Sequence, residues 1–247
     1  MTTITCQPVG DTAIRIQFNE NVSPELNRQI RAFCKRLSDF NVKGVTEWVP
    51  AYNAVHVYYQ PYFISYEKLH AILHDMTYSD SAYQKETVTL VKIPVLYGGK
   101  AGTDIAQVAG NSGLSEQRVI EKHAGVDYLI YMIGFLPGFP YLGGLPEDLA
   151  TPRLVNPRSH VPEGSVGIAG NQTGIYPLAS PGGWNIIGRT PVKLFDPDRE
   201  EPFLYRAGDR IRFVPISKRE YDRIEKHVQH NTFQIEKEVI QDGQLSD

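Results

Sequence analysis

A segment rich in glycine and proline, residues 134–191, carries side chains suited to binding anions and flat organic groups. The planar fork of an arginine donates two parallel hydrogen bonds to a carboxylate or a phosphate, and tyrosine and tryptophan supply apolar walls with one polar atom. The candidates of these kinds are Arg153, Arg158, Gln172, Tyr176, Ser180, Trp184 and Arg189. We expect them to form a substrate site or a subunit interface; the alternative is that they only satisfy the polar backbone of the loops.

Aromatic residues also gather at the start of this segment. Between Tyr131 and Leu145 they are spaced by glycine and proline, with neither a helical nor a strict strand period. The stretch is compatible with an irregular wall of the core. It is equally compatible with a surface that presents Phe135, Phe139 and Tyr141 to a partner, because clustered aromatic side chains dominate the binding energy of many interfaces.

Three other kinds of site are not supported by the residues present. Ser180 is followed by Pro181, which has no N–H to stabilise an oxyanion, so a serine hydrolase is not expected. His70 and His74 stand four residues apart, as two helical metal ligands would, but the sequence offers no third ligand near them. No glycine-rich loop leads into Gly-Lys-Ser/Thr. We therefore expect no metal site, and no nucleotide site of the P-loop type in this chain.

The elements before this segment predict a small α+β domain over residues 1–82. Ser23 and Ser65 are good N-caps for two helices that carry apolar stripes. Alternation of apolar and polar residues predicts strands at residues 12–18, 44–50 and 54–60.

The rest of the chain predicts a mainly β domain over residues 88–220, joined to the first by the polar run 77–86. A strand from Val88 and two short helices within 103–123 come first. The following segment holds 11 glycines and 9 prolines in 58 residues, a density of helix breakers that excludes helices. The charged residues 221–247 are expected to form a terminal helix with a frayed tail. Short apolar pieces between turns predict a closed or strongly bent β-structure from Val166–Ile168, Trp184–Ile187, Val192–Phe195 and Arg210–Val214.

Composition and charge limit the partners. Of the 247 residues 41% are hydrophobic, and 25 lysines and arginines stand against 28 acidic residues. This balance gives no basic field, so neither nucleic acid nor a membrane surface is an expected partner. The sequence starts without a secretory signal, and its most apolar stretch is interrupted by glycine and proline, so we expect a cytoplasmic protein.

Three stretches together resemble one family. They are YMIGFLPGFPYLGGL at residues 131–145, VPEGSVGIAGNQTGIYP at 161–177 and SPGGWNIIGRTP at 180–191. The sequence resembles the B subunit of bacterial 5-oxoprolinase, a family formerly labelled allophanate hydrolase subunit 1, which includes the kinase inhibitor KipI. The likeness extends over about residues 88–215.

The resemblance implies a cyclophilin-like β-barrel for the C-terminal domain, after a small α+β domain. It also implies that the chain is one subunit of an ATP-dependent 5-oxoprolinase, works with the C and A subunits of that enzyme, and is inactive alone. In such an enzyme the lactam of 5-oxo-L-proline is phosphorylated at its amide oxygen and then opened by water to L-glutamate. The ATP used by the complex would bind in, or be shared with, a partner protein, which agrees with the missing nucleotide motif.

The resemblance also bears on the candidate residues. His123 fits a histidine that commonly follows the second helix in relatives, whereas His160 and Glu163 depart from the family pattern. The arginine candidates are suitable in type to hold a carboxylate and stabilise developing negative charge. No catalytic residue is assigned. The alternative function is a KipI-type inhibitor of sensor histidine kinase autophosphorylation, with the kinase as partner, and the sequence does not separate the two functions.

Overall fold

The computed structural model describes residues 4–78 and 87–242, and the chain divides into two compact units, Met1–Gln84 and Lys85–Asp247. Each unit has its own hydrophobic core. Most of the predicted linker 77–86 lies outside the described residues. Among the described residues, no helix combines the length and the apolar character needed to cross a membrane.

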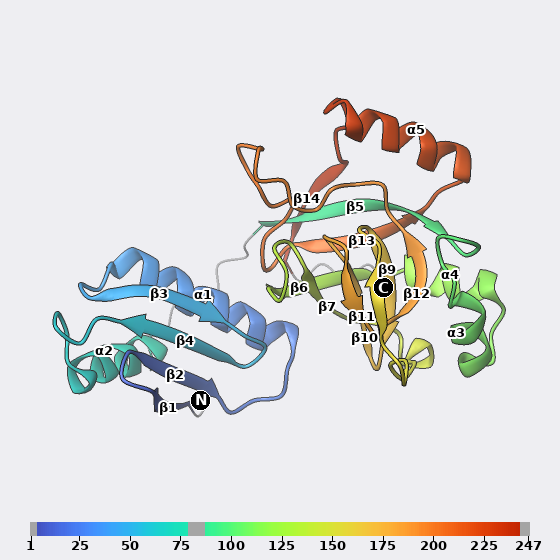
Figure 1. Ribbon diagram of the computed structural model, residues 1–247. Helices are drawn as coiled ribbons and strands as arrows, with labels where there is room; N and C mark the ends of the chain where they lie inside the picture. Colours follow the sequence, from blue (N-terminus) through green and yellow to red (C-terminus); the bar gives the residue numbers. More distant parts are fainter. Residues whose placement is uncertain (1–3, 79–86, 243–247) are drawn as a thin grey trace. The chain divides into compact units, whose positions relative to one another are not determined.

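Unit 1 is a four-stranded antiparallel sheet with two helices packed on it (Figure 1). Ser23 caps the first helix by accepting a hydrogen bond from the N–H of Leu26, as its place before Pro24 indicated. Apolar residues at period two on β2 and β4 meet the apolar stripes of both helices. The strand order is β1-β2-β4-β3, and the elements are β1 (Ile4–Val9), β2 (Ala13–Phe18), α1 (Pro24–Phe40), β3 (Val45–Pro50), β4 (Ala54–Tyr59) and α2 (Tyr66–Tyr78).

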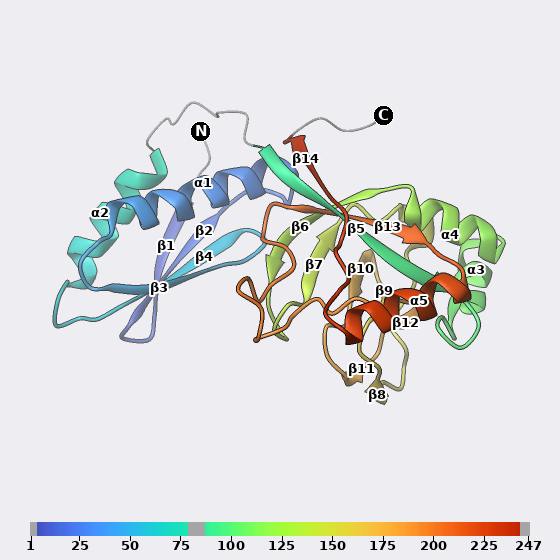
Figure 2. The same cartoon turned by 90° about the horizontal axis from the view of Figure 1, so that it is seen from above.

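Unit 2 is built around a closed β-barrel, whose strands Figure 2 shows from above. The strands of the ring are β5 (Thr87–Tyr97), β6 (Asp127–Ile133), β7 (Pro140–Gly143), β9 (Ser165–Ala169), β10 (Gln172–Ile175), β12 (Asn185–Arg189) and β13 (Arg210–Pro215). They pair in the order β12-β9-β10-β7-β6-β13-β5, and a further pairing of β12 with β5 closes the ring. Only β13 and β5 run parallel among these pairs. Closure pairs strand edges that would otherwise be exposed.

Shorter elements surround the barrel. The helix α3 packs beside β12, α4 beside β13 and α5 beside β5. A separate two-stranded ribbon joins β8 to β11, and β14 extends the sheet at β5. Their bounds are α3 (Ile105–Ser112), α4 (Glu116–Ala124), a 3₁₀ turn (Glu147–Leu149), β8 (Arg158–Val161), β11 (Ser180–Gly182), α5 (Lys218–Gln229) and β14 (Lys237–Gln241).

Two sequence expectations within the barrel region need correction. The stretch Tyr131–Leu145 is irregular only in part: its two ends belong to β6 and β7, which pair in an antiparallel hairpin, and residues 134–139 between them form an irregular turn. The piece Val192–Phe195 is not a strand of the barrel. Its backbone pairs locally, with the carbonyl of Leu194 accepting from the N–H of Leu204, while the side chains of Val192 and Leu194 are buried in the barrel core.

The prediction for the C-terminal residues, a helix followed by a frayed tail, also needs correction. The predicted helix with a frayed tail at 221–247 begins earlier, at Lys218, where Ser217 and Glu220 form a reciprocal capping box. The chain then returns as β14 along β5. Lys92 of β5 forms ion pairs with Glu236 and Glu238 on either side of the first residue of β14, a long-range contact that the local sequence does not reveal.

A buried histidine fixes α4 to the barrel. His123 is 0% exposed, and its ring stacks on Phe213 with 4.5 Å between centroids. Its Nδ1 lies 2.7 Å from Tyr97 Oη and its Nε2 2.8 Å from Thr173 Oγ1. Because the Thr173 hydroxyl donates to the carbonyl of Gly167, it accepts from Nε2–H, and the Tyr97 hydroxyl donates to Nδ1. The ring is therefore neutral, and burial lowers the pKa of His123 from 6.5 to about 3.

Because His123 is neutral in the folded chain, we expect the free energy of unfolding to depend on pH. Below the unfolded pKa of 6.5 the unfolded chain takes up a proton on His123, whereas the folded chain resists it down to about 3. The free energy of unfolding should therefore fall as the pH is lowered through this window. In His123→Gln this slope should be smaller by up to ~1.4 kcal/mol per pH unit.

Urea unfolding at a series of pH values between about 4.5 and 7.5 measures this slope. The matched control is His160→Gln, at a histidine that is exposed. A slope in His123→Gln as steep as that of the wild type would show that His123 is not held neutral in the folded chain.

Candidate functional site

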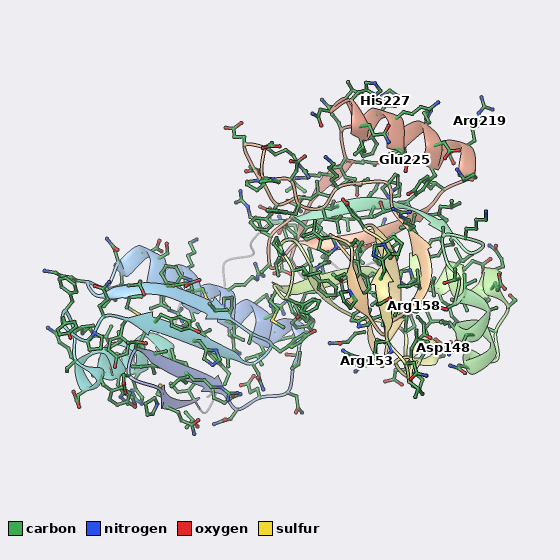
Figure 3. The ribbon with its side chains drawn as sticks, viewed as in Figure 1. Asp148, Arg153, Arg158, Arg219, Glu225 and His227 are labelled. Carbon is green, nitrogen blue, oxygen red and sulfur yellow. The ribbon has the colours of Figure 1, made fainter. Side chains whose placement is uncertain are left out.

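The structure brings several of the predicted candidates together in unit 2. They lie on residues 151–158, which we call the arginine loop, and on three neighbouring aromatic side chains, Phe139, Tyr176 and Trp184, which we call the aromatic cluster. Figure 3 labels Arg153 and Arg158, of which Arg158 is the first residue of β8, and Arg219, which belongs to α5.

The aromatic cluster is a small core of its own. Phe139 precedes β7, Tyr176 follows β10 and Trp184 precedes β12, so the barrel strands deliver all three rings. The three rings meet edge to face, with centroids 5.7 to 6.2 Å apart. Each such pair contributes about 0.5–1.5 kcal/mol beyond simple burial. At Gly182, a Cβ would lie 2.3 Å from Tyr176 Oη, so only glycine lets this backbone approach the hydroxyl so closely.

A buried carboxylate organises the arginine loop. Asp104 Oδ1 accepts from Arg158 Nη2 at 2.6 Å, and Oδ2 accepts from the backbone N–H of Ile186, also at 2.6 Å. Arg158 Nη1 donates further to the carbonyl of Trp184 at 3.2 Å. Asp104 stands at the N-cap position of α3, yet its side chain caps no helix N–H. Its charge instead connects α3, β12 and the arginine loop.

Four more hydrogen bonds hold the loop on both sides of Arg153. They run from Thr151 N–H to Gly170 O (3.1 Å), from Gly170 N–H to Thr151 O (2.7 Å), from Asn185 Nδ2 to Pro152 O (2.9 Å) and from Leu154 N–H to Gly183 O (2.8 Å). The backbone of Arg153 is therefore fixed by the barrel although its side chain is exposed. Such a cation meets an anionic ligand with little loss of backbone freedom.

The two arginines of the loop differ in the charge they can offer. The positive charge of Arg158 is already countered by Asp104. Within the described part of the chain, Arg153 forms no ion pair. Burial raises the pKa of Tyr176, and a backbone hydrogen bond with Trp184 and the charges of both arginines partly oppose that rise. Within the described residues of this region, Arg153 thus presents an exposed guanidinium without an ion pair, a group that suits a carboxylate or a phosphate, whereas Tyr176 is buried beneath the surface.

Other candidates lie at the edge of this region or outside it. Arg189 Nε donates to the carbonyl of Glu163 at 2.8 Å, and its charge acts on Tyr221 of α5 instead of on Tyr176. The half-buried Ser180 lies on β11, where its hydroxyl donates to the carbonyl of Pro181 at 3.3 Å. Ser180 therefore has no basic partner that would make it a nucleophile among the contacts of its described surroundings.

The remaining candidates have different exposures. Gln172 begins β10 and is half-buried, and Tyr141 of β7 is half-buried with its ring 5.3 Å from that of Phe139. Phe135 is exposed at the β6–β7 turn. His123 is corrected as a site candidate: it is enclosed in the barrel core, where neither substrate nor partner can reach it.

Two residues of the site, Asp104 and Asn185, were not predicted from the sequence. The position of Asp104 before a helix indicates an N-cap and not a partner for an arginine, because aspartate is a common N-cap residue. Asn185 lay inside an apolar piece, and its amide donates to the carbonyls of Pro152 and Ile168. Both residues act through backbone segments that are distant in sequence.

The chain is similar to known proteins over most of its length. Residues 4–205 match the family model described as carboxyltransferase domain, subdomain C and D. Two relatives carry the name of the 5-oxoprolinase B subunit. The one from Escherichia coli O157:H7 is 43% identical over 85% of this chain and 95% of its own length. The one from Bacillus subtilis (strain 168) is 37% identical over 87% of this chain and 94% of its own.

The chain is also similar to a solved structure. The crystal structure of TTHA0988 superposes on 83% of this chain with a TM-score of 0.72 and 40% sequence identity. This chain spans 40% of that longer chain. The chain therefore belongs to the family of the carboxyltransferase domain, subdomain C and D, and within it to the B subunits of 5-oxoprolinase.

Proposed function

We propose that this chain is the B subunit of an ATP-dependent 5-oxoprolinase that converts 5-oxo-L-proline to L-glutamate. The observation that carries the proposal is the similarity to proteins of that name, which extends over most of both chains. The closed barrel of unit 2 supports the cyclophilin-like fold expected for such a protein.

The arginine loop supplies the chemistry that this substrate needs. 5-Oxo-L-proline carries one carboxylate on a small, uncharged lactam ring. Arg153, fixed in its backbone and free of an ion pair among the described residues, is the group that binds this carboxylate. Arg158 positions the loop, because Asp104 and the carbonyl of Trp184 occupy its guanidinium.

Partner subunits complete the enzyme. The sequence contains no P-loop motif, so ATP binds in, or is shared with, one of the two partners, the A and C subunits. The chain alone is inactive in this proposal, and the complex works in the cytoplasm. The arginine loop is then one wall of a site that closes only on assembly.

Reconstitution tests the proposal. The purified chain, mixed with the A and C subunits from the same genome, should form glutamate from 5-oxo-L-proline only when ATP is present. Leaving out any one of the three proteins should abolish glutamate formation. Glutamate release is measured with a coupled dehydrogenase assay. An inactive full set would refute the proposal, and inhibition of a sensor histidine kinase by the chain alone would then favour the KipI-type alternative.

Arg153→Ala tests the role of the free guanidinium. In the assembled complex it should lower kcat/KM about 10- to 100-fold, mainly through KM, because a charged hydrogen bond contributes about 1.5–3 kcal/mol. Arg153→Lys should restore part of this loss, since it keeps the charge without the fork. The matched control is Arg219→Ala, at an exposed arginine of α5. Unchanged kinetics in Arg153→Ala would place the substrate carboxylate elsewhere.

A further inference from the structure

An enclosed side chain, that of Asn185 at the start of β12, reaches from the barrel to the arginine loop. Asn185 is 0% exposed. Its Nδ2 donates to the carbonyl of Ile168 on β9 at 3.1 Å and to the carbonyl of Pro152 in the arginine loop at 2.9 Å. An amide nitrogen carries two N–H donors, so these two carbonyls use both of them and fix the direction of the side chain. Asn185 therefore links the loop to the barrel through its donor atoms.

The bond to Pro152 acts on one of the two peptide groups that flank Arg153. The carbonyl of Pro152 and the N–H of Arg153 belong to the same planar peptide group, so a hydrogen bond to that carbonyl orients both. The carbonyl of Arg153 and the N–H of Leu154 form the next peptide group, which donates to the carbonyl of Gly183 at 2.8 Å. With both planes held, the backbone dihedral angles of Arg153 are set, and so is the direction of its Cα–Cβ bond.

Asn185 supplies the only side chain among the four hydrogen bonds that hold the loop beside Arg153. The other three join backbone groups. Pro152 has no N–H, so its carbonyl is the one backbone group through which the fold can hold this residue. Asp104 acts elsewhere, on Arg158 at the far end of the loop. Of these two side chains that hold the loop, Asn185 is thus the one that acts on a peptide group of Arg153.

We propose that Asn185 is a positioning residue of the 5-oxoprolinase reaction, which sets the direction in which Arg153 meets the carboxylate of the substrate. The inference rests on the proposed function. Asn185 acts through the loop and does not touch the substrate, because its side chain is fully enclosed. It holds the cation in place before the substrate arrives, so that less freedom is lost on binding. Loss of Asn185 should therefore weaken substrate binding more than it slows the chemical step.

Two readouts test this role. In the assembled complex, Asn185→Ala should raise KM for 5-oxo-L-proline about 3- to 10-fold, as the loss of one hydrogen bond implies, and leave kcat within about twofold. In the isolated chain, the backbone order parameters of Arg153 and Leu154, measured by NMR relaxation, should fall from about 0.85 to below about 0.6. Asn185→Ser, whose hydroxyl is too short to reach the loop, should behave alike and serves where Asn185→Ala folds poorly.

The matched control is Asn27→Ala, at a buried asparagine of α1, which should change neither KM nor the order parameters of the loop. A wild-type KM in the Asn185 variants would overturn the inference, and so would a loss that falls equally on kcat, which indicates general damage to the fold. Order parameters that stay near those of the wild type while KM rises would overturn it as well. A wild-type complex that does not open 5-oxo-L-proline would instead refute the proposed function, and the inference with it.

Discussion

The buried carboxylate of Asp104 is the constraint on which the candidate site depends. Its two oxygens hold Arg158 and the backbone of Ile186, so one charge connects the start of α3, the strand β12 and the arginine loop. Removing either member of such a pair leaves the other charge buried without compensation, which costs more than the intact pair contributes. This arrangement decides which arginine is available: Arg158 is occupied by the fold, and Arg153 faces the solvent.

The sequence predicted the elements whose signals are local. The cap at Ser23, the alternation on β2 and β4 and the two short helices within 103–123 each depend on neighbouring residues, and all of these elements are present. Elements stabilised by distant partners were not predicted. The strand β14 exists because β5 offers it an edge and Lys92 offers it a cation. The piece Val192–Phe195 has the alternation of a strand but pairs with a nearby loop.

The same difference between local signals and distant partners separates the candidate site residues. Arg153, Tyr176 and Trp184 were selected by residue type, and the barrel brings them into one region; their role in binding stays a prediction. Residue type was not enough to separate them from His123, whose burial depends on the packing of α4 against β13 and β10. Asp104 was missed because its partner Arg158 lies 54 residues away in sequence. Long-range pairing, which only the fold supplies, decides which polar groups hold the structure and which stay available to a ligand.

The most direct test of this account is a double-mutant cycle on kcat/KM of the assembled enzyme, with Asp104→Asn and Arg153→Ala. If Asp104 acts by holding the loop that presents Arg153, the double variant should be about as impaired as the more impaired single variant. If the two losses multiply, Asp104 and Arg153 act independently, and the claim that one buried carboxylate organises the site would be contradicted.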